Sequence, residues 1–273
     1  MSVWTYEGKR VVIAGCYSGM GEAAARELVR LGAEVHGADM RPSPVRMASF
    51  HTVDLRDPLS IDAALDAIGG PIDALFNCAG LPQTFPAGDV MKVNFIGLRH
   101  WTEKALPMIR PGGAIASISS TAGFAYFQHL PQILELLATP GFEAAADWCE
   151  RHADLVGDGY AFSKEASIVW TMMMGTRTIA QGVRTNCICP GPTETPMMPA
   201  FERTASARII DVFTTPIGRR SKPEEQAYPL IFLNSGAASF INGHALNVDG
   251  GFVGGITAGQ IDLQGLLAQA MAG

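Results

Sequence analysis

The chain has 273 residues, of which 48% are hydrophobic and 17% are charged, and its formal net charge is −6. This composition is typical of a globular protein with a large core, and the lack of a Lys/Arg-rich run argues against a nucleic-acid partner. Residues 1–10 lack an apolar signal core, and no stretch reaches the roughly 18 apolar residues of a membrane span. We therefore expect a cytoplasmic protein with no membrane partner.

The cysteines and histidines give no sign of a metal site. Five cysteines are scattered along the chain: Cys16, Cys78, Cys149, Cys187 and Cys189. An odd, irregularly spaced set favours reduced thiols over a disulfide framework. Cys187 and Cys189 have no companion pair, and the six histidines show no ligand spacing, so we expect no bound metal.

Strand-like apolar runs alternate with helical patterns along the whole chain. The first strand is predicted at residues 10–14, and the glycine-rich turn after it leads into a helix. Further strands are predicted at residues 34–38, 51–53, 74–77, 114–119, 184–189 and 245–248. This order predicts one domain over residues 1–273, a doubly wound, seven-stranded parallel sheet of Rossmann type with helices on both faces. Ligands of such sheets bind beyond the carboxyl ends of the strands.

Two segments depart from this alternation. Residues 124–159 contain two helical patterns, at 128–138 and 142–154, separated by Pro140 and Gly141, and we interpret them as a helical insertion. The tail, residues 252–273, is apolar, with leucines at near-helical spacing. We expect it to pack on its own subunit or on a neighbouring one.

The turn after the first strand carries glycines at positions 15, 19 and 21. An ordinary tight turn can have this spacing, but here it joins a strand to a helix, where backbone N–H groups bind phosphate. We predict that Gly15, Ser18, Gly19, Met20 and Gly21 hold the pyrophosphate of a dinucleotide.

The second strand is followed by an acidic residue. Asp39 lies where a carboxylate accepts hydrogen bonds from the adenosine ribose and repels a 2′-phosphate, which favours NAD. Arg41 is the complication, since an arginine there can bind the 2′-phosphate of NADP.

Tyr160 and Lys164 open a predicted helix, four residues apart, and so share one face of it. An ammonium about 4 Å from a phenol favours the phenolate by roughly 4 kcal/mol at an effective dielectric of 20. Such a pair can serve as a general acid or base, although the spacing by itself is common on solvated helices.

Several motifs, taken in order, resemble the short-chain dehydrogenase/reductase family over nearly the whole chain. They are the glycine turn, Asp54-Leu55, the segment Asn77-Cys78-Ala79-Gly80, Asn94, Ser120, Tyr160 with Lys164, the segment from Pro190 to Thr195, and Val248-Asp249-Gly250-Gly251. Two positions differ from many relatives: Ala14 replaces a threonine, and Cys78 replaces an asparagine.

The resemblance implies catalytic roles for four residues. Tyr160 exchanges a proton with the substrate oxygen, Ser120 hydrogen-bonds the same oxygen, and Lys164 lowers the pKa of Tyr160. Asn94 is expected to hold a water that relays protons. Ser119 is the other candidate for the role given to Ser120. The alternative for Ser119 is a hydroxyl at a strand end that is hydrogen-bonded to the backbone.

The resemblance also implies further cofactor contacts. Lys164 bonds the nicotinamide ribose, and Tyr160 also belongs to the cofactor site. Asp54 contacts the adenine amino group. The remaining expected contacts are Leu55, Asn77, Ala79, Gly80, Pro190, Gly191, Thr193 and Thr195.

Ser120 and Tyr160 are 40 residues apart because of the insertion. This separation resembles the branch of the family that contains bacterial 3α-hydroxysteroid dehydrogenase/carbonyl reductase and coniferyl alcohol dehydrogenase. The branch implies a hydrophobic alicyclic, aryl, steroid or terpenoid alcohol, or its ketone. We predict a substrate pocket lined by Phe124, Trp148, Met197 and Met198, although packing of the insertion is the alternative role for such residues.

Three further expectations follow from the resemblance. We expect a homodimer or homotetramer, because in typical members the helices carrying Asn94 and Tyr160 pack against their copies. A ring-diol (cis-dihydrodiol) dehydrogenase is the alternative enzyme. A catalytically idle NAD-binding sensor is the alternative outside enzymes, but it has no reason to retain Asn94, Ser120, Tyr160 and Lys164 together.

Overall fold

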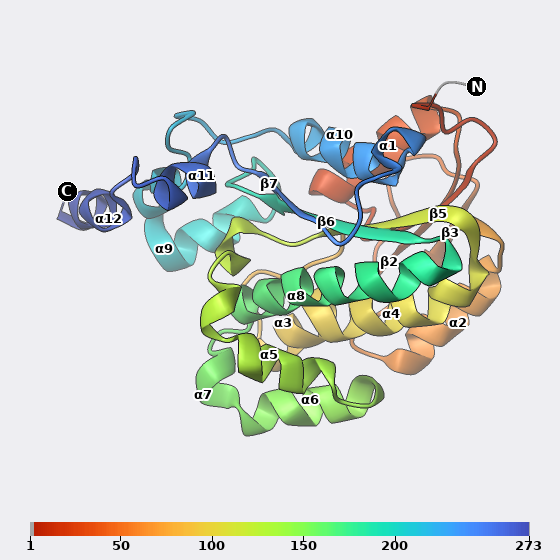
Figure 1. Cartoon of the computed structure of the whole chain (residues 1–273), viewed down its shortest axis with the longest axis horizontal. Coiled ribbons are helices and arrows are strands. Elements are labelled where there is room, and N and C mark those ends of the chain that lie inside the picture. The colour runs from red at the N-terminus through yellow and green to blue at the C-terminus, as the bar shows by residue number, and fades with distance from the viewer. Residues whose placement is uncertain (1–2, 273) are drawn as a thin grey trace.

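The structure is a computed structural model that describes residues 3–272 (Figure 1). Its centre is a seven-stranded, all-parallel sheet in the order β3-β2-β1-β4-β5-β6-β7. The strands are β1 (Arg10–Ala14), β2 (Glu34–Asp39), β3 (Ser49–Thr52), β4 (Ile72–Asn77), β5 (Ile109–Ile118), β6 (Arg184–Pro190) and β7 (Ala245–Val248). The predicted doubly wound parallel sheet is therefore confirmed.

Alternate residues of the central strands enter two different cores. Val12 and Leu75 belong to the cluster under α2 (Pro58–Ile68), α4 (Gly97–Ala105) and α8 (Tyr160–Thr178). Val11 and Phe76 belong to the cluster under α1 (Gly19–Arg30) and α10 (Pro223–Asn234). Figure 1 shows these two helical layers on opposite faces of the sheet. Burial on both faces explains why the strands have continuous apolar runs.

The strand predictions differ from the structure mainly at their ends. β5 begins at Ile109, five residues before the predicted start, because Pro111, Gly112 and Gly113 obscure the strand pattern. The pairing of β4 with β5 also shifts register between Ile72 and Ala74. Such irregularities leave no periodic signal in the sequence.

The predicted insertion forms three helices, α5 (Leu130–Leu137), α6 (Gly141–Arg151) and α7 (Ala153–Val156), in an outer layer beyond α8 (Figure 1). Arg99 of α4 donates hydrogen bonds to the backbone oxygens of Leu136 and Thr139, and α5 packs on α8. The insertion therefore covers the outer sides of α4 and α8 with residues of the same chain.

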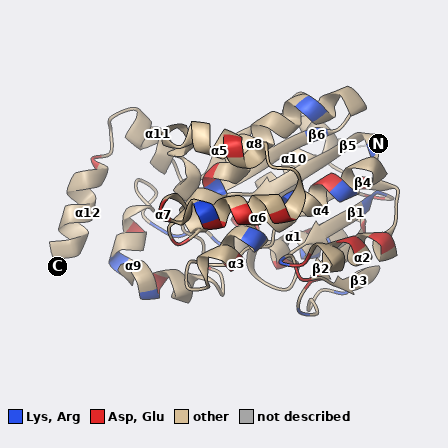
Figure 2. Ribbon diagram, turned by 90° about the horizontal axis from the view of Figure 1, so that it is seen from below, with Lys and Arg blue, Asp and Glu red and all other residues tan. Residues whose placement is uncertain are grey.

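The tail folds into α11 (Phe252–Thr257) and α12 (Leu263–Ala272). α12 packs against α9 (Met198–Val212), and it carries no charged residue, as Figure 2 shows. None of its described residues is buried, so its contact with the body is shallow. Among residues 3–272, no helix is long and apolar enough to cross a membrane.

Candidate active site

The predicted dinucleotide turn lies where the strand order reverses, between β1 and β4. A β-carbon on Gly15, which has φ +85°, would lie 2.2 Å from the backbone nitrogen of Ala79, so only glycine fits there. α1 begins beyond this turn at Gly19, and its first turn presents unpaired N–H groups. A cradle with no side chain over a helix N-terminus fits the pyrophosphate of a dinucleotide.

Asp39 ends β2 beside this turn, and backbone groups hold its carboxylate. Its two oxygens accept hydrogen bonds from Tyr17 N at 3.0 Å and Arg41 N at 3.2 Å. The guanidinium carbon of Arg41 lies 3.8 Å from the centre of the Tyr17 ring. The carboxylate thus occupies the position predicted for a ribose contact, while the Arg41 cation rests on an aromatic ring.

Two predicted adenosine contacts already have partners. Asp54 accepts hydrogen bonds from Arg56 Nε at 2.9 Å and Nη2 at 2.7 Å, and these bonds lower the pKa of Asp54. Asn77 is 1% exposed and donates through Nδ2 to Thr102 at 2.8 Å and to Ser117 at 3.1 Å. The Asn77 side chain therefore ties β4 to α4 and β5, and the predicted contact of this residue with the cofactor stays a prediction.

Asn94 lies in a short π-helical turn, η1 (Lys92–Ile96), between α3 (Ala87–Met91) and α4. Its Oδ1 accepts a hydrogen bond from Leu81 N at 2.6 Å, and its Nδ2 donates to Leu81 O at 3.0 Å. Both amide atoms therefore fix the segment that follows β4. Single π-turns of this kind are often found at functional sites.

Ser120 follows β5 and caps a 3₁₀ turn, η3 (Thr121–Gly123), by accepting from Ala122 N at 3.1 Å. This turn lies directly on α8, because a β-carbon on Gly123 would be 2.6 Å from the carbonyl carbon of Lys164. The contact brings the Ser120 hydroxyl to the first residue of α8, where it acts to lower the pKa of Tyr160. Residues 40 positions apart in the sequence therefore form one polar pair.

The rival serine has a different role. Ser119 is 2% exposed, and its hydroxyl donates to the backbone oxygen of Lys164 at 2.9 Å. This bond ties β5 to α8 and leaves Ser119 facing the protein interior. The geometry therefore favours Ser120 as the serine that can contact a substrate.

Lys164 lies one helical turn beyond Tyr160 and is 4% exposed. Its Nζ donates to the backbone oxygen of Ile118 at 3.2 Å and lies 5.6 Å from the centre of the Tyr160 ring. A β-carbon on Gly80 would be 3.9 Å from this Nζ and 3.5 Å from Oδ1 of Asn94. Tyr160, Lys164, Ser120 and Asn94 are thus gathered at the carboxyl ends of β4 and β5.

Burial controls the protonation of this group. It raises the pKa of Tyr160 to about 12, although the hydrogen bond with Ser120 acts in the lowering direction. It lowers the pKa of Lys164 to about 8. Desolvation of the phenolate is therefore the largest effect on the pKa of Tyr160, and the lowering expected from Lys164 stays a prediction.

The open side of the group is covered by α9 and the segment before it. The Phe201 and Tyr160 rings meet edge to face, with 5.0 Å between their centres. Phe124 and Met197 are half-buried, and Met198 is buried. Gln83 Nε2, from the loop after β4, donates to Thr204 Oγ1 at 2.7 Å and joins α9 to that loop.

The Gln83–Thr204 contact joins residues 121 positions apart and has no signal in the sequence. α9 also contains a kink at Ser206, with φ 54°, and Arg220 pairs with Glu202 and Asp211 on the two sides of it. These contacts fix a helix that borders the predicted substrate site.

Trp148 does not line this site. Its ring stacks on His152 with 4.0 Å between centres and on Phe162 with 6.0 Å between centres, and the residue is 5% exposed. Trp148 therefore packs α6 of the insertion onto α8, which corrects its assignment to the substrate pocket.

Thr195 lies next to the predicted dinucleotide-binding turn. A β-carbon on Gly19 would lie 3.4 Å from the Thr195 Cβ and Cγ2 atoms, so the segment after β6 reaches the start of α1. Thr193 lies deeper in this segment, with its hydroxyl 2.9 Å from both Gly191 O and Ser221 Oγ. Thr195 is therefore the better placed of the two to contact a bound molecule.

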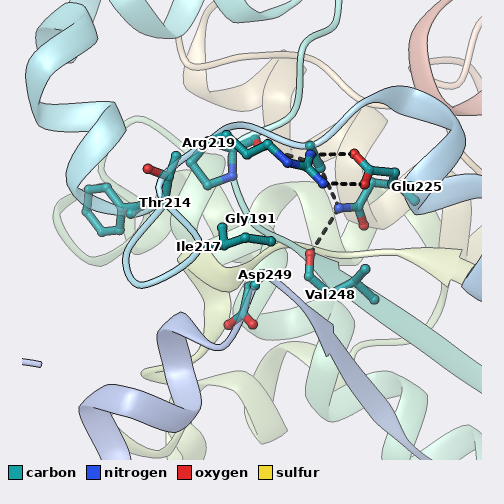
Figure 3. A pocket seen from close by; sticks show the side chains of 12 residues that line it. Gly191, Thr214, Ile217, Arg219, Glu225, Val248 and Asp249 are labelled. Atoms are coloured by element: carbon teal, nitrogen blue, oxygen red, sulfur yellow. Dashed lines mark hydrogen bonds and ion pairs between the residues drawn. The ribbon is translucent and has the colours of Figure 1, made fainter. Parts of the chain in front are cut away.

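A cavity of about 210 Å³ lies on the other side of the same segment (Figure 3). Gly191, Ile217 and Val248 contribute to its wall, and the Arg219–Glu225 ion pair, at 2.6 Å, lies at its edge. None of the predicted catalytic residues lines it. Among the described residues there is also no cluster of three or more His, Cys, Asp or Glu side chains that could hold a metal.

Comparison with known proteins matches the chain to two family models. Residues 9–132 match the model described as short chain dehydrogenase, and residues 151–253 match the model described as enoyl-(acyl carrier protein) reductase. The gap between the two matches falls within the helical insertion.

Individual relatives are similar over most of their length. A coniferyl-alcohol dehydrogenase of a Pseudomonas species is 33% identical over 89% of this chain and 96% of its own. A 3-alpha-hydroxysteroid dehydrogenase/carbonyl reductase of Comamonas testosteroni is 34% identical over 88% of this chain and 95% of its own.

A solved structure agrees with this relationship. The 3-alpha-hydroxysteroid dehydrogenase of Pseudomonas sp. B-0831, crystallised with NADH, is 29% identical, covers 92% of this chain and 99% of its own, and has a TM-score of 0.77. The fold, the ordered motifs and these relatives agree, and the chain belongs to the short-chain dehydrogenase/reductase family of nicotinamide-dependent oxidoreductases.

Proposed function

We propose that this enzyme is an NAD-dependent dehydrogenase that interconverts a bulky hydrophobic alcohol and its carbonyl compound. The observation that carries the proposal is the Tyr160–Ser120 hydroxyl pair beneath the ring of Phe201. Two hydroxyl groups that meet at the carboxyl end of a strand can hold one substrate oxygen between them. An apolar cover over that point suits a hydrophobic substrate.

NAD is the cofactor that the adenosine side fits best. The carboxylate of Asp39 faces the turn, and the Arg41 guanidinium stacks on the ring of Tyr17. The NADH in the related hydroxysteroid dehydrogenase supports the same choice. When bound, NAD supplies hydride transfer at its nicotinamide ring.

The proton chemistry belongs to Tyr160, Ser120 and Lys164. A Tyr160 pKa of about 12 keeps the phenol protonated at neutral pH, which is the form that donates a proton to a carbonyl oxygen. Ser120 donates a hydrogen bond to the same oxygen and holds it in place. Lys164 stabilises the phenolate when Tyr160 accepts a proton from an alcohol. Asn94 fixes Leu81 next to this group.

The expected substrate class rests on the substrates of the related enzymes and on the apolar residues that border Tyr160. The relatives named above act on coniferyl alcohol and on 3-alpha-hydroxysteroids. Phe201, Phe124 and Met197 give this chain an apolar border beside Tyr160, and flexible thioethers adapt to varied shapes. We therefore expect aryl, alicyclic or steroidal alcohols rather than sugars.

We also expect a homodimer or homotetramer, but we do not expect α4 and α8 to form its interface. In typical family members α4 and α8 pack on their copies, whereas here α5 and α6 cover them. Association should therefore use another surface. Light scattering at micromolar concentration tests this, and a monomeric mass would contradict it.

The function is tested by a substrate panel followed at 340 nm. Cinnamyl alcohols, steroids, terpenols, cyclohexanols and ring diols are each assayed with NAD and with NADP. We expect turnover with at least one hydrophobic alcohol, a preference for NAD, and its loss in Tyr160→Phe while NADH binding persists. Activity confined to ring diols would favour a dihydrodiol dehydrogenase, and near-normal turnover by Tyr160→Phe would overturn the mechanism.

A further inference from the structure

A tight turn in the loop after β4 is held next to the catalytic group. Asn94 bonds both backbone groups of Leu81, which donates through N at 2.6 Å and accepts through O at 3.0 Å. Phe85 N donates to Pro82 O at 3.3 Å and closes a turn over residues 82–85. Gln83 is the second residue of this turn, so its backbone is fixed on both sides.

The side chain of Gln83 reaches across to α9. Its Nε2 donates to Thr204 Oγ1 at 2.7 Å, and the Thr204 hydroxyl donates to Phe201 O at 2.9 Å. The Phe201 ring meets the Tyr160 ring, with 5.0 Å between the centres. These contacts form one chain from the loop after β4, over α9, to the first residue of α8, along the border of the proposed substrate site.

The hydrogen bonds of Thr204 determine which way the Gln83 amide faces. A threonine hydroxyl has one hydrogen, and here that hydrogen is directed at Phe201 O, so Oγ1 is an acceptor for its other neighbour. The group of Gln83 that faces Oγ1 is therefore the NH₂ and not the oxygen. Oε1 lies on the other arm of the amide, directed away from Thr204.

Oε1 of Gln83 is a buried acceptor without a donor. The side chain is half-buried, its Oε1 is closed off from solvent, and no described residue donates a hydrogen bond to it. The other described side chains with such an oxygen lie outside the chain of contacts that reaches Tyr160. A buried carbonyl oxygen without a donor costs free energy, and a ligand that carries a donor recovers it.

The chemistry around Oε1 indicates which ligand group fits it. The neighbouring border of the site is apolar, and Phe124, Met197 and Phe201 contribute half-buried side chains to it. A neutral amide oxygen accepts a hydrogen bond from a hydroxyl group, whereas an ether or ketone oxygen offers it no hydrogen. A site that bonds a hydroxyl group also discriminates strongly against an analogue that lacks it.

We propose that Gln83 is a specificity-determining residue: its Oε1 accepts a hydrogen bond from a second hydroxyl group of the substrate, remote from the carbon that reacts at Tyr160. The proposal rests on the proposed function, because it takes the space beside Tyr160 as the substrate site. It narrows the substrate class to hydrophobic alcohols that carry a further hydroxyl group, such as phenolic aryl alcohols or steroid diols. Thr204 anchors the amide so that Oε1 stays available.

Substitutions at Gln83 and Thr204 separate the acceptor from the anchor. Gln83→Leu keeps a side chain of similar size and removes the acceptor. Gln83→Glu keeps an acceptor oxygen in either protonation state. Thr204→Val removes the partner of Nε2 and leaves Oε1 in place. Thr84→Ala, at the exposed neighbouring position of the same turn, is the matched control.

The first experiment measures the binding of alcohols to the enzyme–NADH complex, in which they cannot be oxidised. Calorimetry compares cinnamyl alcohol with its para-hydroxy and para-methoxy derivatives, and androstan-3α-ol with androstane-3α,17β-diol. We expect the compound with the additional hydroxyl group to bind the parent about tenfold more tightly in at least one series. The methoxy compound, which has no hydrogen to donate, should bind like unsubstituted cinnamyl alcohol.

The variants decide whether Gln83 causes this preference. Gln83→Leu should abolish it, whereas Gln83→Glu and Thr84→Ala should keep it. The absence of a preference in both series of the parent, or a preference that survives in Gln83→Leu, would overturn the proposal.

The second experiment measures kcat and KM for the pairs that the enzyme oxidises. Both alcohols of a pair are assayed on one preparation, so a loss of folded protein cancels in their ratio of kcat/KM. We expect Gln83→Leu to raise KM for the hydroxylated alcohol about tenfold more than for its partner. Thr204→Val should change both KM values by the same factor, because the acceptor remains. Equal changes of KM in Gln83→Leu would show that Gln83 only anchors α9 and would overturn its role in specificity.

These experiments distinguish the role of Gln83 from the proposed function. If Tyr160→Phe retains activity, the proposed function fails, while binding to the NADH complex still reports whether Gln83 recognises a hydroxyl group. If Tyr160→Phe is inactive and Gln83→Leu matches the parent for every alcohol, the function stands and the role of Gln83 is wrong.

Discussion

The ring of Phe201 meets the ring of Tyr160 edge to face, with 5.0 Å between the centres. This contact joins α9, which follows β6, to the first residue of α8. Phe201 therefore lies beside the residue whose hydroxyl is expected to meet the substrate. The loop after β4 supports the arrangement, because Gln83 donates to Thr204 on the same helix.

Replacing Phe201 tests its contact with the substrate. Phe201→Ala should raise KM for an aryl or steroidal alcohol by about fivefold and change kcat less, because an aromatic contact contributes about 1 kcal/mol. Steady-state kinetics with one bulky and one small alcohol measure the split. Arg203→Ala, an exposed change on α9, is the control. An unchanged KM for the bulky alcohol would place the substrate elsewhere.

Lys164 should make the protein less stable at neutral pH. Its pKa falls from 10.5 unfolded to about 8 folded, so the unfolded state binds more protons between these values. The unfolding free energy of the parent should therefore rise as pH increases from about 8 to 10. The cost present below pH 8 is up to about 3 kcal/mol.

The corresponding variant is Lys164→Met. It should unfold at higher denaturant concentration than the parent at pH 7, converge with the parent near pH 10, and lack activity. Urea unfolding at several pH values measures this. A variant less stable than the parent at pH 7 would show that the buried ammonium is well compensated.

A polar contact between His129 and Glu165 anchors the insertion to α8. Glu165 is 4% exposed, and its carboxylate lies 2.8 Å from Nδ1 of the half-exposed His129. His129→Ala leaves a buried carboxylate without this partner, so we expect a loss of about 2 kcal/mol in unfolding free energy. Urea denaturation measures it.

Glu165→Gln provides the comparison for this pair. In the double variant His129→Ala/Glu165→Gln, the loss should be smaller than the sum of the two single losses, because the charge is gone. Additive losses would mean that the two side chains do not interact.

Asp39 should set the cofactor preference. Asp39→Ala removes the carboxylate that Tyr17 N and Arg41 N hold, so kcat/KM for NAD should fall by about tenfold. The value for NADP should rise, since the repulsion of a 2′-phosphate is lost while Arg41 remains. Adding Arg41→Ala should reverse that rise. A parent that already prefers NADP would contradict the assignment.

The sequence by itself determined the fold class and the order of the functional segments. Strand ends, glycine spacing and the four-residue step from Tyr160 to Lys164 are local patterns, and local patterns can be recognised without knowing the packing. The same is true of the insertion, whose two predicted helices are separated at Pro140, whereas the break near His152 was not predicted.

Only the tertiary structure decided what the individual side chains do. Asn77 and Trp148 proved to be packing residues because their partners come from other elements. The pKa of Tyr160 rises because burial outweighs the hydrogen bond with Ser120, and burial has no signal in the sequence. The meeting of Phe201 with Tyr160, and of Gln83 with Thr204, depends on long-range contacts that periodicity does not encode.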